Sequence, residues 1–169
     1  MNESKSLPEL FVHELCDAHD SETQLTKALR KMASAAQNPD LQAAFSKHLE
    51  ETVGQLKTLD EVFVLLEQKP TPKHSDGIAG VLKEEGGDQG ELPKSAMRDV
   101  VLLGGGRRAE HYEIAAYATL IAMGEELDYA EACKKLRGIL AQEEAADKTL
   151  AGLAKKINRD AHNESMAKA

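Results

Sequence analysis

The sequence predicts an all-α protein in which four long helices form one bundle. Ala, Leu, Glu and Lys dominate the 169 residues, whereas the chain has only three Phe, three Tyr and no Trp. This composition favours helices over strands. Four long segments place apolar residues three and four positions apart, which is the spacing of one helix face. A chain of this length buries a full core as one unit, so we expect a single domain over residues 1–169.

The first two helices are expected over residues 7–37 and 39–68. Asn38 and Pro39 mark the boundary between them, because proline suits the first turn of a helix. Pro70 then stops the second helix. The short link makes this pair an antiparallel hairpin.

The second pair of helices is expected over residues 94–123 and 129–159, with Gly124 at the break between them. A crossover over residues 69–93 joins the two pairs, and it contains a short expected helix at 78–85. This connection is long enough to run from one end of a bundle to the other.

One long crossover between two hairpins is the connectivity of ferritin-like four-helix bundles. A plain up-down-up-down bundle with an irregular connection fits the same spacing. Connectivity alone leaves both open.

Three consecutive glycines, Gly104–Gly106, stand inside the third expected helix. They cost about 2–3 kcal/mol of helix propensity relative to alanine. A kink, a close approach of another helix or a frayed segment would each account for them.

Acidic and amide side chains interrupt the apolar stripes near the middle of all four segments. Helical spacing turns five carboxylates inward: Glu22, Glu51, Glu113, Glu143 and Asp147. Buried charges are costly unless they are paired or coordinated, and no Lys or Arg shares their register. Two divalent cations would bring +4 against −5. The pattern therefore predicts two metal ions, unless several of these glutamates lie at the edges of their stripes.

The spacing of these side chains repeats between the two halves. In each half a lone glutamate precedes a second glutamate by 29 or 30 residues, and an amide or acid follows four residues later. A pseudo-twofold axis would bring six oxygen-bearing side chains around one centre. These six are the predicted metal ligands: Glu22, Glu51, Gln55, Glu113, Glu143 and Asp147.

Four stretches of the chain carry a family resemblance. They are Ser21–Leu25, His48–Thr52 with Gln55, Glu110–Tyr117, and Glu143 with Asp147 ahead of Lys148–Leu150. They make residues 7–155 similar to the YciE/YciF-like stress proteins of the ferritin-like superfamily, and Glu-His-Tyr-Glu-Ile-Ala-Ala-Tyr is the most specific stretch. The resemblance implies a bacterial ferritin-like bundle that forms a homodimer, holds two metal ions and is induced under osmotic or related stress. Iron is the expected metal, with manganese or another divalent cation as alternatives.

One departure from related bundles bears on the ligands. Di-iron bundles use Glu-x-x-His on two helices, but the residues three after Glu51 and Glu143 are Gly54 and Ala146. The predicted centre is therefore rich in oxygen donors. Three further side chains have open roles as ligands, ligand partners or core residues: His48, His111 and Tyr117.

Composition argues against several partners. The formal net charge of −8 disfavours binding to nucleic acid or to an anionic membrane. No apolar run approaches the roughly 18 residues of a transmembrane helix, and the first residues lack a secretory signal. Cys16 and Cys133 cannot form a disulfide framework, so the reducing cytoplasm is the expected location.

Three hypotheses of function follow. In the first, a ferritin-like stress protein reacts with O2 or peroxide at a di-iron centre, as an oxidase or peroxide-consuming enzyme. In the second, a non-enzymatic bundle with a structural or vestigial metal site acts through association with partners. A third hypothesis, an iron-storage cage, requires a large closed shell.

Overall fold

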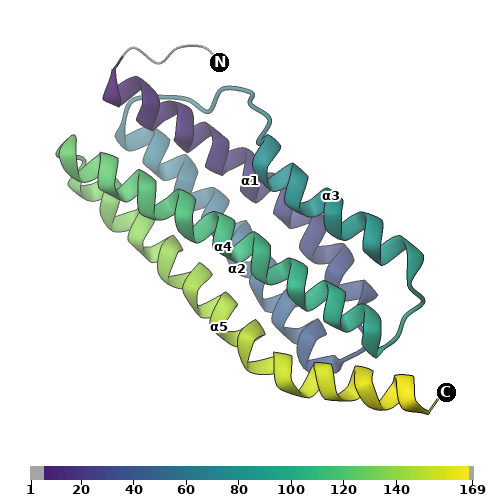
Figure 1. The fold of residues 1–169 in the computed structure, drawn as a ribbon. Coiled ribbons are helices and arrows are strands. Elements are labelled where there is room, and N and C mark those ends of the chain that lie inside the picture. The colour runs from purple at the N-terminus through teal and green to yellow at the C-terminus, as the bar shows by residue number, and fades with distance from the viewer. Residues whose placement is uncertain (1–5, 168–169) are drawn as a thin grey trace.

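The structure is a computed structural model that describes residues 6–167, and all regular secondary structure in this range is helical. Its helices are α1 (Leu7–Ala35), α2 (Pro39–Leu65), α3 (Asp76–Glu91), α4 (Ala96–Glu126) and α5 (Ala130–Met166). The four long helices form a bundle, and α3 lies along it in the connection between α2 and α4 (Figure 1).

The connection between the two hairpins distinguishes the two kinds of bundle. α1 packs on α2 and α4 packs on α5, and contacts between α2 and α5 and between α1 and α4 close the ring. The chain leaves α2 at one end of the bundle, and α3 carries it along α1 and α4 toward the other end, so α2 and α4 run in the same direction (Figure 1). This crossover is ferritin-like. The predicted all-α ferritin-like bundle is confirmed, and the up-down-up-down alternative is wrong.

Side-chain caps fix where three of the long helices begin. Ser6, Asn38 and Ser95 each accept a hydrogen bond from a backbone N–H in the first turn of α1, α2 and α4 respectively. The Asp99 carboxylate also accepts the backbone N–H groups of Gln37 at 2.7 Å and Asn38 at 2.9 Å. The start of α4 is thereby tied to the turn between α1 and α2.

Some helices run further than expected from sequence. α4 continues through Gly124 to Glu126. A Cβ at Gly124 would lie 2.6 Å from the Cys133 sulfur on α5, so this position has no room for a larger side chain. The glycine lets α5 approach and does not end the helix. α5 continues past residue 159 to Met166, and there Glu164 accepts a hydrogen bond of 2.9 Å from the Ala96 backbone N–H. α3 is also longer than the expected 78–85.

The run Gly104–Gly106 lies within unbroken helix. A close approach accounts for Gly106, because a Cβ there would lie 2.8 Å from the Phe45 ring and 3.1 Å from Leu150. α4 therefore packs tightly against α2 and α5 at this point.

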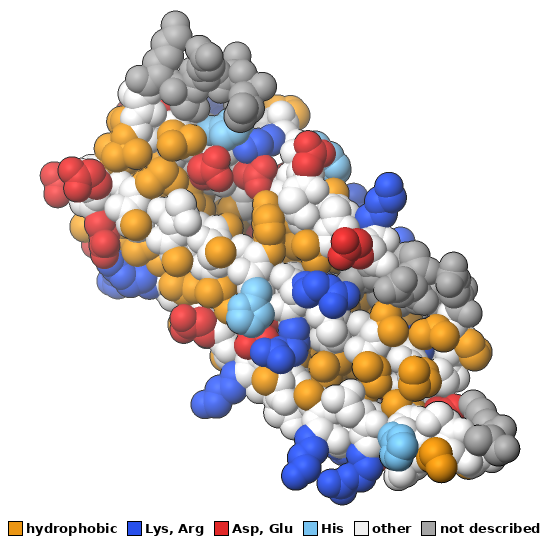
Figure 2. All heavy atoms as spheres, viewed as in Figure 1, with side chains coloured by type: hydrophobic (Ala, Val, Ile, Leu, Met, Phe, Trp, Pro, Cys, Tyr) orange, Lys and Arg blue, Asp and Glu red, His pale blue; other side chains and the backbone are white. Residues whose placement is uncertain are grey.

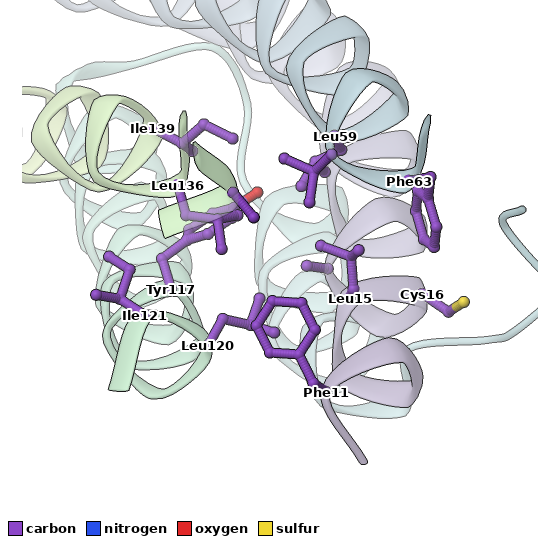
Figure 3. Close-up of a cluster of buried hydrophobic side chains, with 13 residues drawn as sticks. Phe11, Leu15, Cys16, Leu59, Phe63, Tyr117, Leu120, Ile121, Leu136 and Ile139 are labelled. Atoms are coloured by element: carbon purple, nitrogen blue, oxygen red, sulfur yellow. The ribbon is translucent and has the colours of Figure 1, made fainter. Parts of the chain in front are cut away.

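Two apolar clusters occupy the bundle, one toward each end. The first, drawn in Figure 3, includes Phe11, Leu15, Leu59, Phe63, Leu120 and Leu136. The second includes Leu25, Leu29, Leu41, Phe45, Leu102 and Leu150. The helical turns between these clusters carry buried polar side chains. Within residues 6–167, no helix has the length and apolar character needed to cross a membrane.

Candidate metal centre

A layer of buried polar side chains separates the two apolar clusters. All four long helices contribute to it, and each contributing residue is at most 4% exposed. The layer consists of Glu22 from α1, His48 and Gln55 from α2, Glu110, Glu113 and Tyr117 from α4, and Glu143 from α5.

Four members of this layer converge on one point. One ligand atom each of His48, Glu110, Glu113 and Glu143 lies within 4.8 Å of the other three. The Nε2 atom of His48 is 3.2 Å from Glu110 Oε1 and 3.4 Å from Glu143 Oε2. Opposite ligands of a six-coordinate ion with bonds of about 2.1 Å are roughly 4.2 Å apart. The four side chains are therefore close to the spacing that a divalent cation requires.

Hydrogen bonds from neighbouring side chains orient the carboxylates. The Tyr117 hydroxyl donates to Glu22 at 2.5 Å, and the Ser21 hydroxyl donates to Glu113 at 3.4 Å. Gln55 donates its amide to Glu143. Such partners of ligands fix ligand orientation in metal sites. Figure 3 shows Tyr117 among the side chains of the first apolar cluster, and its hydroxyl bonds to Glu22, so this residue belongs to both the core and the polar layer.

Each carboxylate of the layer keeps one oxygen without a hydrogen bond among the described residues. These oxygens belong to Glu22, Glu110, Glu113 and Glu143. Both ring nitrogens of His48 and the amide oxygen of Gln55 also have no hydrogen bond among the described residues. Buried polar atoms without partners are rare, because each one costs the free energy of its lost hydration. The chemistry of this set, mostly oxygen with one imidazole, fits a divalent cation such as iron or manganese.

Burial also changes the protonation of the layer. It raises the pKa of Glu22, Glu110 and Glu143 to about 8 each, and it raises the pKa of Glu113 well above its usual range. Repulsion between neighbouring carboxylates adds to the desolvation. These side chains therefore hold protons at neutral pH unless a cation takes the place of those protons.

Two of the predicted ligands lie outside this cluster, at the edges of the bundle. Glu51 is 22% exposed and forms an ion pair with Lys47. Asp147 is 18% exposed, and it accepts hydrogen bonds of 2.7 and 3.3 Å from Arg107. His111 Nε2 is 3.5 Å from the same carboxylate, and the Arg107 hydrogen bond lowers the pKa of Asp147. On the face in Figure 2, basic side chains and a histidine gather over the middle of α4.

The structure brings together Glu22, Gln55, Glu113 and Glu143 of the six predicted ligands. It adds Glu110, which is not among the six predicted ligands, and it places His48 among the carboxylates. Glu110 precedes Glu113 by three residues and so shares its helix face. This three-residue spacing is the sequence signal that could have identified Glu110 as a member of the site. His48 was harder to assign, because it precedes Glu51 instead of following a glutamate by three residues.

The chain has clear relatives in sequence. A family model described as a domain of unknown function, DUF892, matches residues 6–162. The chain is 38% identical to Protein YciF of Escherichia coli strain K12 over 164 residues, which cover 95% of this chain and 98% of YciF.

Solved structures extend the comparison to the fold. The crystal structure of the Escherichia coli stress protein YciF matches with a TM-score of 0.88 and 36% identity, over 92% of this chain and 98% of that chain. YcfI from Rhodopseudomonas palustris matches with a TM-score of 0.86 and 38% identity, over 89% and 96%. A bacterioferritin-related protein of Bacteroides fragilis, described as a dodecameric thioferritin, is 19% identical with a TM-score of 0.69, over 93% and 90%. This last likeness shows that the ferritin-like fold is shared.

Proposed function

The chain belongs to the DUF892 family, and we propose that it is a bacterial stress-response protein whose bundle holds two iron ions. The relative YciF is described as a stress protein, which supports the physiological role. The buried polar layer supports the metal.

The proposed ligands of this centre are the members of the layer other than Tyr117. His48, Glu110, Glu113 and Glu143 already converge on one point, and Glu22 and Gln55 are buried beside them. When ionised, the four carboxylates among these side chains carry −4, which two divalent cations neutralise. A pair of ions therefore fits the charge of the layer better than a single ion.

Iron at this centre would supply electrons to O2 or to a peroxide. The protein's own contribution is to exclude bulk water by the apolar clusters on either side of the layer. Tyr117 holds Glu22 in place through its hydroxyl. The single imidazole leaves the oxygen donors dominant, an environment that suits iron or manganese.

The observation that carries the proposal is the set of buried oxygen and nitrogen atoms of the layer that have no hydrogen bond to any described residue. Aerobic addition of Fe²⁺ to protein freed of metal by chelation tests it. We expect two iron ions per chain by plasma emission, and a rise of Fe³⁺ absorbance faster than in buffer. Glu144→Gln is the matched control, because Glu144 follows Glu143 on α5 but is exposed.

The same experiment separates the hypotheses of function. Stoichiometric binding of Zn²⁺ that raises the melting temperature, without accelerated oxidation of Fe²⁺, would identify the structural site of a non-enzymatic protein. A chain that takes up neither metal would contradict the metal centre.

We also propose a homodimer in the cytoplasm. Large apolar side chains remain exposed on the first two helices: Leu7, Leu10, Val53, Val64 and Leu65. A second copy would cover them. The free thiols of Cys16 and Cys133 support a reducing compartment. Light scattering that gives twice the chain mass supports the dimer, and a particle of twelve or more chains would favour a storage cage instead.

A further inference from the structure

A small pocket lies between α2, α4 and α5 on the flank of the buried layer. Its volume is about 20 Å³, which is enough for one water molecule. His48 and Glu110 line its inner side. Lys47 and Glu51, whose side chains are 68% and 22% exposed, line it where α2 meets solvent. The pocket therefore connects the proposed metal centre with the surface of the protein.

The imidazole of His48 stands between one surface carboxylate and two buried carboxylates. Its Nδ1 atom is 3.8 Å from Glu51 Oε2, whereas its Nε2 atom is 3.2 Å from Glu110 and 3.4 Å from Glu143. Neither nitrogen has a hydrogen-bond partner among the side chains that the structure describes, although the His48 side chain is only 5% exposed. His48 is thus a buried nitrogen donor with one nitrogen toward Glu51 and the other toward the centre.

The ion pairs at the two edges of the layer, Lys47–Glu51 and Arg107–Asp147, differ in strength. Lys47 reaches Glu51 from one turn earlier on the same helix, and its long side chain is mostly in solvent. Exposed pairs of this kind are worth less than about 1 kcal/mol, so an arriving divalent cation displaces the ammonium readily. At the other edge, Arg107 donates two hydrogen bonds to the Asp147 carboxylate. A forked pair of this kind is harder to open.

Resting on the metal centre proposed above, we propose that the pocket beside Glu51 is the route by which divalent cations reach the centre. Glu51 captures a hydrated cation at the surface while the Lys47 ammonium moves into solvent. His48 then passes the cation to Glu110 and Glu143. Glu51 therefore sets the rate of uptake, whereas the buried carboxylates set the affinity at equilibrium.

Stopped-flow uptake of Co²⁺ by metal-free protein tests this route, with d–d absorbance as the signal. We expect Glu51→Gln to slow uptake about tenfold, because a surface carboxylate raises the local concentration of the cation. We expect Lys47→Met to speed uptake by a few fold. Glu50→Gln is the matched control and keeps the wild-type rate, because Glu50 is the exposed neighbour on the same helix. Equilibrium titration of each variant gives the number of Co²⁺ ions bound.

The rate and the end point test different claims. Slowed uptake by Glu51→Gln with an unchanged Co²⁺ stoichiometry supports the route. A wild-type rate for Glu51→Gln overturns it, because the cation would then enter elsewhere. A lowered stoichiometry for Glu51→Gln also overturns it, because Glu51 would then be a ligand of the centre. If the wild-type protein binds no Co²⁺ at equilibrium, the proposed metal centre is wrong. This outcome is distinct from a test of the route, which compares the uptake rates of the variants with that of the wild type.

Discussion

The two helical hairpins have similar architecture, but they contribute different chemistry to the centre of the bundle. The α1–α2 hairpin supplies one carboxylate, one imidazole and one amide: Glu22, His48 and Gln55. The α4–α5 hairpin supplies three carboxylates: Glu110, Glu113 and Glu143. At the edges, the Lys47–Glu51 pair of the first hairpin is a single contact from a mostly exposed lysine, whereas Arg107 of the second hairpin makes two hydrogen bonds to Asp147.

This difference shows that a repeated spacing reproduces the backbone arrangement without reproducing the chemistry. Helical periodicity decides which positions face inward. The side chains at those positions decide how much charge each hairpin buries. Because three of the four carboxylates of the buried layer lie on α4 and α5, substitutions in the second hairpin are expected to have the larger effect on metal binding.

The largest expected effect is on metal affinity. We expect Glu143→Gln to weaken metal binding by about 100-fold or more, because it removes a fully buried anionic ligand. His48→Gln, in the first hairpin, removes a neutral donor and is expected to cost about tenfold. Plasma emission after dialysis against graded chelator gives both values. A greater loss for His48→Gln than for Glu143→Gln would show that the second hairpin does not dominate the centre.

The next effect is on the pH dependence of the metal-free protein. The folded-state pKa values of about 8 for Glu110 and Glu143 exceed the unfolded value of about 4.3. Between these values the folded state binds more protons, so the free energy of unfolding falls as pH rises. We expect stability to be greatest near pH 5 and to fall by several kcal/mol, about 10 °C in melting temperature, by pH 8.

Melting curves with chelator present give this slope. Glu110→Gln should flatten it, because that variant removes one of the buried protons, whereas Glu144→Gln should leave it unchanged. Added Zn²⁺ should stabilise the protein more at pH 8 than at pH 5, because the cation competes with protons for the same oxygens. An equal slope in Glu110→Gln and the wild type would mean that the buried carboxyls do not cause the pH dependence.

A smaller effect concerns the contact between the hairpins. Gly106→Ala gains about 1 kcal/mol of helix propensity, but its Cβ would lie 2.8 Å from the ring of buried Phe45 on α2. We expect a net loss of about 1–2 kcal/mol from overpacking. Gly104→Ala is the matched control, because its Cβ would meet only the end of the Arg108 side chain at 3.5 Å. It should gain about 1 kcal/mol, and thermal melting compares the two. Equal melting temperatures would show that the hairpins do not pack tightly at Gly106.

The fold could be predicted from sequence because its signals are local. Apolar spacing, the boundary at Asn38 and Pro39, and Pro70 after α2 each act within one or two helical turns. The role of Gly124 could not be read in the same way. What occupies the space beside it is Cys133 of the next helix, and that contact depends on how α4 and α5 pack.

The candidate site was predictable only in its general position. The stripes identified which turns of each helix carry inward polar side chains. They could not show that Asp147, at the edge of its stripe, lies close to Arg107. The Lys47–Glu51 pair is different, because its four-residue spacing on one helix can be read from the sequence. Arg107 is 40 residues from Asp147 in sequence. Such a pairing depends on how α4 is rotated against α5. The apolar periodicity of one helix does not report this rotation.

The smallest expected effect separates Asp147 from the buried carboxylates of the same hairpin. Asp147→Asn removes a charge that Arg107 already neutralises at the edge of the bundle. We expect a loss of at most about 1 kcal/mol, because the pair is partly exposed, or roughly 2–4 °C in melting temperature. Metal content should stay at the wild-type value, in contrast to Glu143→Gln one turn earlier on α5. Plasma emission and thermal melting of the same preparations measure both. A clear loss of metal in Asp147→Asn would show that this carboxylate leaves Arg107 and coordinates the metal, and it would restore the symmetry that the repeated spacing predicts.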